Sequence, residues 1–99
     1  MSSIDKGRRN QLKARRLLEA MGYQCEVARF SRWGSTDFFG LWDIIAIDKR
    51  DIKFVQVKTN RLPSPIEREQ YELFECPSCV SRELWIFYDR KSEPRVIKY

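Results

Sequence analysis

Residues 42–59 read WDIIAIDKRDIKFVQVKT, and this stretch decides the fold. Its two β-rich segments, Trp42 to Asp48 and Ile52 to Thr59, flank the polar turn Lys49-Arg50-Asp51. The spacing and composition of this turn predict a β-hairpin. The expected register pairs residues whose numbers sum to 99, so that Asp48 lies opposite Asp51 and an even number of residues forms the tip of the turn.

This register gathers three polar side chains on one face of the hairpin. Asp43 lies opposite Gln56, and opposed residues share a face. The two-residue period of a strand puts Lys58 on that face as well, while Val55 and Val57 face the other side. A slip of one residue would send Asp43 to that other side, so the cluster depends on the register.

The residue types in this cluster suit chemistry at a phosphate. Oxygen atoms of Asp43, Gln56 and the Val57 backbone carbonyl are hard ligands that can hold Mg²⁺ or Mn²⁺. Lys58 can orient or deprotonate a water molecule, or balance the charge that develops on the phosphate. The reaction implied is phosphodiester hydrolysis. The alternative is that these three side chains are simply the solvated face of a hairpin.

Two helices are expected on either side of this hairpin in the sequence. Apolar residues at alternating spacings of three and four predict an amphipathic helix from Ile4 to Met21, which Gly22 ends. Ser64-Pro65-Ile66-Glu67 is a capping box with proline at the first helical position, and it predicts the start of a second helix. In that second helix the residues at helical spacing are Ile66, Gln70, Leu73 and Phe74.

Three further strands complete the expected α/β domain of residues 1–99. Tyr23 to Phe30 alternates apolar and polar residues, Leu84 to Tyr88 is apolar enough to be buried on both faces, and Arg95 to Tyr99 reads as a short edge strand. A strand, a crossover helix and another strand predict a parallel pair, whereas the hairpin is antiparallel. The expected architecture is therefore a mixed sheet with a helix on each face.

The composition limits both the compartment and the chemistry. Ninety-nine residues with 42% hydrophobic and 33% charged side chains are typical of one soluble globular domain. The longest apolar run is too short to cross a membrane, so a cytoplasmic protein is expected, in a cell or, for a viral protein, in the host. The chain has no histidine, which excludes imidazole-based catalysis and histidine-ligated zinc.

Basic residues are concentrated near the start of the chain. Residues 1–33 carry eight Lys and Arg against three acidic residues, whereas residues 62–89 carry two against six. Such an uneven distribution is expected of a protein that meets a phosphate backbone. The candidate contacts on the first helix are Lys6, Arg8, Arg9 and Lys13. A solvated helix face is the alternative interpretation of the same charges.

The residues Asp43 and Gln56-Val57-Lys58, within this order of elements, resemble the PD-(D/E)XK nuclease superfamily. The pair Lys6-Gly7 on a basic helix is similar to archaeal Holliday-junction resolvases, and the resemblance spans residues 6–88. It implies a restriction-endonuclease-like fold and a DNA endonuclease that depends on Mg²⁺ or Mn²⁺. It also implies branched DNA as the substrate and a homodimer, because two sites are needed to cut two strands.

Two glutamines depart from the pattern of that family. The resemblance places Gln11 where the resolvases carry a metal-binding Glu on the first helix, and Gln56 where the motif ends in an acid. Gln11 lies within the apolar stripe of the helix, so it faces the sheet and can offer an amide oxygen. Asp37 is an auxiliary candidate for a second carboxylate, because Gly40 lets the intervening loop fold back toward Asp43.

The loop before the hairpin adds candidate contacts with nucleic acid. The resemblance puts a substrate-contacting segment here, which holds Ser31, Arg32, Trp33 and Ser35. Trp33 can stack on an unpaired base and Arg32 can bind phosphate, although packing of Trp33 is an equal alternative. Arg61, just after the hairpin, either touches the nucleic acid backbone or is solvated.

Two other functions fit parts of the same sequence. A module that binds nucleic acid on the nuclease-like fold without cutting it would explain the glutamines at positions 11 and 56. A protein-interaction domain would instead use the acidic second half of the chain. Cys76 and Cys79 have the spacing of zinc ligands, but too few further ligands exist for a structural site, and free cysteines are expected.

Overall fold

The hairpin forms the centre of a five-stranded sheet in the computed structural model, which describes residues 3–31, 34–35 and 37–99. Its strands are β4 (Ile44–Ile47) and β5 (Ile52–Thr59). Ile44 pairs with Val55 and Ile47 with Ile52, so the expected register is confirmed. β4 is shorter at its start than the sequence predicts, because residues 38–42 close a tight turn before the strand begins.

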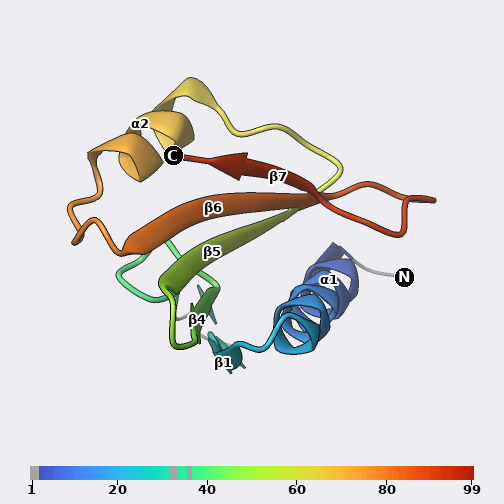
Figure 1. The fold of residues 1–99 in the computed structure, drawn as a ribbon. Coiled ribbons are helices and arrows are strands. Elements are labelled where there is room, and N and C mark those ends of the chain that lie inside the picture. Colours follow the sequence, from blue (N-terminus) through green and yellow to red (C-terminus); the bar gives the residue numbers. More distant parts are fainter. Residues whose placement is uncertain (1–2, 32–33, 36) are drawn as a thin grey trace.

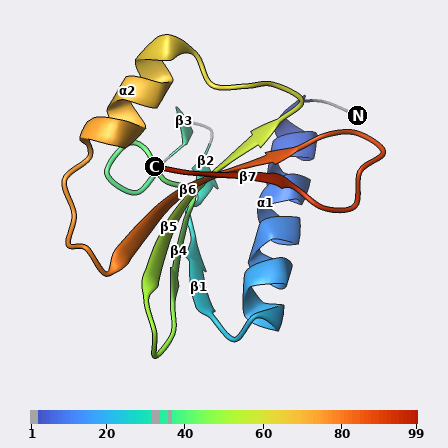
Figure 2. The same ribbon diagram turned by 45° about the horizontal axis from the view of Figure 1, so that its top comes forward.

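The other strands extend the sheet on both sides of the hairpin, in the order β1-β4-β5-β6-β7. β1 (Gln24–Val27) is antiparallel to β4, and β7 (Arg95–Lys98) is antiparallel to β6. β6 (Val80–Phe87) runs parallel to β5, as expected from the crossover through α2 (Pro65–Leu73). Figure 2 shows these strands fanned across the molecule.

A small second sheet occupies part of the segment that the sequence predicts to be a loop. β2 (Phe30–Ser31) and β3 (Gly34–Ser35) pair antiparallel with each other and lie outside the main sheet. The expected strand from Tyr23 to Phe30 is therefore divided into β1 and β2. The fold is α/β with one five-stranded mixed sheet and two helices.

The two helices cover opposite faces of the main sheet (Figure 1). α1 (Ser3–Ala20) packs Ala14 and Leu18 against the face that carries Val55, Trp85 and Phe87. α2 packs Tyr71 against the other face, which carries Leu84 and Ile86. Both sets of β6 side chains are buried, so the prediction of a strand buried on both faces is confirmed.

The buried face of α2 differs from the one the sequence predicts. Ile66 and Leu73, expected to pack inward, are 71% and 70% exposed, and the buried residue is Tyr71. Phe74 packs inward as expected, but Gln70 is exposed and the other inward residues of the helix are Glu67 and Tyr71. An ion pair of Glu67 with Lys58 and the packing of Tyr71 on Trp42 fix this orientation, and neither partner is on the helix itself.

Neither helix of the described chain has the length and apolarity needed to cross a membrane.

Candidate functional site

The candidate site forms where β4 separates from β5 at Asp43. The Asp43 N–H still donates to the Val55 carbonyl at 2.8 Å, but beyond it the chain turns away. The Oδ2 atom of Asp43 accepts a hydrogen bond from the Val57 N–H at 2.9 Å and so takes the place of the missing backbone carbonyl. This bond fixes the Asp43 carboxylate, which is 4% exposed, at the edge of β5.

A tight turn brings a second carboxylate to Asp43. The Phe38 N–H donates to the Trp42 carbonyl at 2.7 Å, and Gly40 adopts a φ of +67°, as expected of the residue that lets the loop fold back. The Asp37 carboxyl then lies close enough to that of Asp43 to raise the pKa of Asp43. Negative charge on Asp37 disfavours a second negative charge on Asp43.

The pKa of Asp43 reflects this arrangement. Burial raises it most, the hydrogen bond from the Val57 N–H lowers it, Asp37 raises it, and the nearby Lys58 ammonium lowers it. Together these effects raise the pKa of Asp43 from its ordinary value of 3.8 to about 7. Asp43 is therefore an acid that releases its proton near neutral pH, where an incoming cation can compete for it.

Gln56 lies beside Asp43 as the register requires. With its amide nitrogen turned toward the site, Gln56 donates to the Leu41 carbonyl at 2.5 Å and to Asp43 Oδ2 at 3.2 Å. In the opposite orientation the amide oxygen faces these acceptor atoms, an arrangement that a cation between them would stabilise. The Val57 carbonyl points to the same strand edge as the Val57 N–H, which is the edge that Asp43 occupies.

Lys58 is buried and paired with Glu67, a residue that no sequence pattern assigned to the site. Its Nζ is hydrogen-bonded to Oε2 of Glu67 on α2, and Arg61 approaches the same oxygen at 3.8 Å. Burial raises the pKa of Glu67, but the hydrogen bonds from Lys58 and from Ser64 at the helix start have a larger, opposite effect. The net result is a pKa lowered to about 2. The capping box identified Glu67 as a residue of the helix start. Its second partner, Lys58, is on β5, and the contact forms because α2 packs back on the sheet.

Gln11 lies apart from these residues. It belongs to the face of α1 that packs on the sheet, whereas Gln56 and Lys58 project from the opposite surface toward α2. Gln11 is 7% exposed and lines a cavity with Arg8, Leu12, Val27, Ala28 and Arg29. The structure therefore does not bring Gln11 into contact with Asp43, although Ala28 in this cavity donates its N–H to the Asp43 carbonyl.

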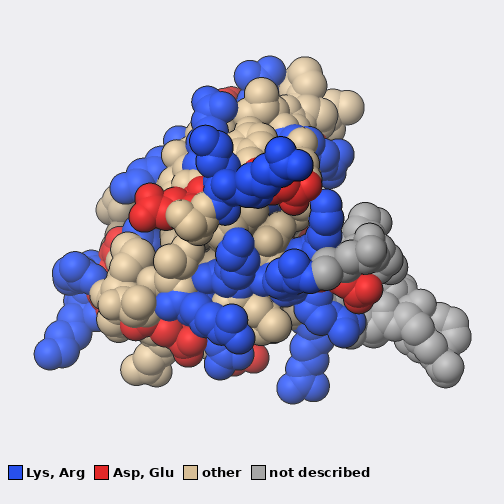
Figure 3. All heavy atoms as spheres, turned by 90° about the vertical axis from the view of Figure 1, so that its right-hand side faces the viewer, with Lys and Arg blue, Asp and Glu red and all other residues tan. Residues whose placement is uncertain are grey.

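A basic surface lies at the carboxyl ends of β5 and β6. Asn10 Nδ2 donates to Thr59 Oγ1 at 2.7 Å, and Lys6 forms an ion pair with Asp89 at 3.0 Å, so the first turns of α1 are held at this end of the sheet. A groove here is lined by Lys6, Arg9, Lys13, Arg90 and Lys91. Figure 3, which views the molecule from this end, shows many Lys and Arg side chains spread over this face, with a smaller number of Asp and Glu side chains among them.

Two members of this basic groove were not expected from the sequence. Arg90 and Lys91 follow β6, far along the chain from α1, and no local pattern relates them to it. The register of β6 beside β5 places them there. Of the other expected contacts, Arg8 lies at the Gln11 cavity, Arg61 lies near Glu67, and Arg32 and Trp33 lie outside the described residues. The backbones of Ser31 and Ser35 belong to β2 and β3.

The comparisons with known proteins add no relatives. The chain matches no protein-family model and no curated protein sequence. The site must therefore be judged on its own geometry. Over the described residues, His, Cys, Asp and Glu side chains form no group of three that could hold a metal ion. The polar side chains gathered at this part of β5 are the carboxyl groups of Asp37 and Asp43 and the Gln56 amide.

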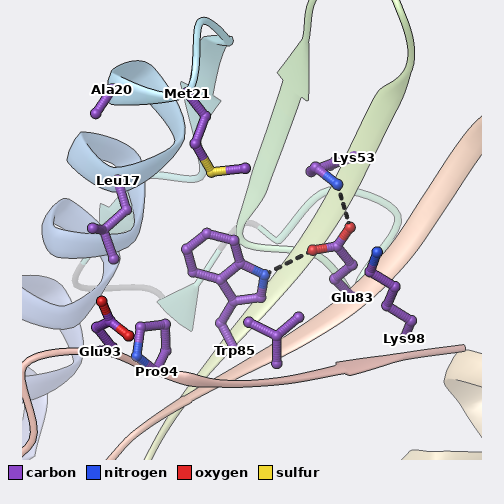
Figure 4. A pocket seen from close by; sticks show the side chains of 10 residues that line it. Leu17, Ala20, Met21, Lys53, Glu83, Trp85, Glu93, Pro94 and Lys98 are labelled. Atoms are coloured by element: carbon purple, nitrogen blue, oxygen red, sulfur yellow. Dashed lines mark hydrogen bonds and ion pairs between the residues drawn. The ribbon is translucent and has the colours of Figure 1, made fainter.

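A second cavity, at the other end of β5, contains a buried ion pair (Figure 4). Lys53 Nζ donates to Glu83 Oε2 at 2.6 Å, and the Ser81 hydroxyl and the Trp85 indole also donate to this carboxylate. Burial raises the pKa of Glu83, but these three hydrogen bonds outweigh it and the pKa is lowered. Because every polar atom of the pair is satisfied, we interpret it as structural.

Proposed function

We propose that this protein is a divalent-metal-dependent endonuclease that hydrolyses DNA phosphodiester bonds, on a fold of the restriction-endonuclease type. The observation that carries the proposal is the buried Asp43 carboxylate, fixed by the Val57 N–H, with Asp37 and the buried Lys58 close to it. A carboxyl pair with an amide neighbour is an oxygen-rich site, and the lysine adds a fixed positive charge. This combination suits a reaction in which negative charge builds up on a phosphate.

The side chains fit Mg²⁺ or Mn²⁺. Asp43 is held in place by the Val57 N–H, and its proton is released near neutral pH, so a cation at this position would relieve the repulsion between two carboxylates. Asp37, Asp43 and Gln56 would hold the ion, with the Val57 carbonyl pointing to the same edge. When bound, such an ion neutralises charge on the phosphate and orients it.

Lys58 and Glu67 have separate roles in this proposal. The Lys58 ammonium stabilises the negative charge that the phosphate gains in the transition state. Glu67 holds that ammonium in place and, through its hydrogen bonds with Ser64, ties it to the start of α2. Glu67 is therefore a positioning residue, and it compensates the charge of a lysine that is only 5% exposed.

The basic groove supports DNA as the substrate. Lys6, Arg9, Lys13, Arg90 and Lys91 lie at the same end of the sheet as Lys58, but on the α1 side, whereas Lys58 projects toward α2. DNA bound in this groove would reach the carboxyl pair around that end of the sheet. A single copy carries one such pair, and cutting both strands at a branch point would require two copies, which is why we propose that the chain acts as a homodimer.

A second function, binding of DNA without cleavage, is favoured by one observation. The glutamines at positions 11 and 56 leave fewer acidic ligands than the motif they resemble, and Gln11 does not reach the site. A binding module of this kind would keep the basic groove and bind DNA in the presence of a chelator.

Cleavage assays with matched variants separate these functions. Linear duplex, single-stranded, flapped and four-way-junction DNA are incubated with wild type, Asp43→Asn, Lys58→Met and the exposed-site control Lys49→Met, in EDTA, Mg²⁺ or Mn²⁺. We expect metal-dependent cutting by wild type and the control, and a loss of about 100-fold or more in the two site variants. Circular dichroism confirms that each variant is folded.

Cutting in EDTA, or cutting retained by Asp43→Asn, would rule out the proposed metal site. Tight binding of all variants with no cutting in either metal would favour the binding module. The preferred substrate identifies whether branched DNA is recognised.

A further inference from the structure

The cavity around Gln11 contains a polar group whose partner within the described protein is missing. Gln11 is 7% exposed and lies in the apolar stripe of α1, yet its amide forms no hydrogen bond with another described residue. The Gln11 amide is not among the enclosed side-chain atoms without a partner, so it is accessible from the cavity, where it can pair with water or a ligand. The Gln11 amide lines a cavity whose volume is about 440 Å³, within the range of ligand pockets.

The walls of this cavity combine apolar and cationic groups. Val27 and Ala28 of the sheet and Leu12 of α1 supply the apolar surface, and Arg8 and Arg29 supply guanidinium groups. Both arginines already have partners in the protein. A guanidinium has five N–H donors, however, so one partner leaves donors for a phosphate.

We propose that this cavity binds one unpaired nucleotide of the DNA, with its base against the Gln11 amide and its phosphate at Arg8 and Arg29. A base has a flat apolar face and an edge of hydrogen-bond donors and acceptors, which an amide can pair with on both sides. A simple anion would use the arginines but would not need the amide or the apolar walls. The cavity therefore favours a nucleotide over inorganic phosphate.

This inference rests on the proposed function for the location of the DNA. The Ala28 N–H donates to the Asp43 carbonyl at 2.7 Å, so the cavity lies directly behind the carboxyl pair, on the α1 side of the sheet. A strand that passes the carboxyl pair on one surface can place a neighbouring unpaired nucleotide around the edge, in the cavity. Fully paired DNA cannot do so without breaking a base pair.

The test compares two duplexes that differ in one nucleotide. One carries a single bulged 2-aminopurine and the other has the same base fully paired, and both are titrated with protein in EDTA so that no cleavage occurs. We expect affinity for the bulged duplex to be about tenfold higher, and 2-aminopurine fluorescence to change on binding as the base leaves its stack. The Gln11→Leu variant should lower the affinity ratio to about one.

Gln24→Leu is the matched control, because Gln24 is an exposed glutamine on β1 at which the ratio should not change. Equal affinity of wild type for the bulged and the paired duplex would overturn the inference and leave the nuclease proposal intact. The same holds if Gln11→Leu, shown by thermal unfolding to be folded, leaves the affinity ratio unchanged. Failure to bind either duplex would instead count against the proposed function. Inorganic phosphate that displaces the bulged duplex no better than an equal ionic strength of chloride would exclude a simple anion site.

Discussion

At the scale of single residues, the hydrogen bonds of Asp43 stabilise the fold, whereas the burial of its charge destabilises it. Its backbone and its Oδ2 atom stabilise the hairpin through Val55 and Val57, but its charge is buried beside Asp37. The turn length and the strand period were enough to predict its position opposite Gln56. The contact with Asp37 depends on how residues 38–42 turn, so sequence spacing could only suggest it.

The raised pKa of Asp43 makes the protein less stable as pH rises. Between its ordinary value of 3.8 and about 7, the folded state holds a proton that the unfolded state has lost, so the free energy of unfolding falls over this range. Asp43→Asn keeps an acceptor for the Val57 N–H but removes the charge. Relative to wild type, this variant should gain about 2 kcal/mol of stability between pH 5 and pH 8. Urea unfolding in EDTA measures the difference, and a difference that does not change with pH would contradict the assigned pKa.

The same proton should oppose metal binding. Below about pH 7 the ion must displace the Asp43 proton, so the apparent affinity for Mn²⁺ should rise about tenfold per pH unit up to neutrality and then level off. Isothermal titration calorimetry from pH 5.5 to 8.5 measures this dependence. A protein in which Mn²⁺ binding is independent of pH would have its metal ligands elsewhere.

At the scale of elements, α2 shows where local pattern and tertiary contact compete. The capping box at Ser64 fixed the start of the helix correctly, because it depends only on neighbouring residues. Apolar spacing failed to identify the buried face, because Lys58 on β5 and Trp42 before β4 attract Glu67 and Tyr71. The register of the β4–β5 hairpin and the parallel pairing of β5 with β6 were predictable for the same reason as the helix cap. Each depends on a short stretch of the chain.

Two variants at the start of α2 separate its cap from its ion pair. Ser64→Ala removes the hydroxyl that accepts the Glu67 N–H and should cost about 1 kcal/mol of stability. Glu67→Ala removes both the reciprocal bond and the partner of buried Lys58, and should cost about 3 kcal/mol. The Glu67 contribution is present above pH 4.5 and is lost as the pH falls through about 2. Equal costs in denaturant unfolding at pH 7 would show that the Lys58 pair contributes nothing.

At the scale of the whole molecule, charge is separated between the two ends and faces of the sheet. The first turns of α1 and the chain after β6 make one end basic, while residues 62–89, which contain α2, carry six acidic residues against two basic ones. The sequence predicted a basic first helix. Only the three-dimensional arrangement shows that Arg90 and Lys91 lie beside this helix in the basic groove.

The contribution of these two residues to DNA binding is measurable from its salt dependence. Arg90→Gln with Lys91→Gln should lower the slope of log affinity against log salt by about 2, because two phosphate contacts and their released counterions are lost. Lys49→Gln with Arg68→Gln removes the same charge from exposed positions away from the groove, and its slope should stay close to that of wild type. Fluorescence anisotropy from 50 to 200 mM salt provides the slopes, and equal slopes for the two double variants would show that DNA binds elsewhere.

Strand β7 forms one edge of the main sheet, and its side chains decide how that edge meets other molecules. A strand with unpaired N–H and C=O groups is a template for aggregation unless charge protects it. Arg95 and Lys98 stand exposed at either end of β7, with only Val96 and Ile97 between them. Two copies aligned strand to strand in antiparallel fashion would bring these positive charges face to face. The repulsion between these like charges therefore opposes extension of the sheet at this edge by a second copy.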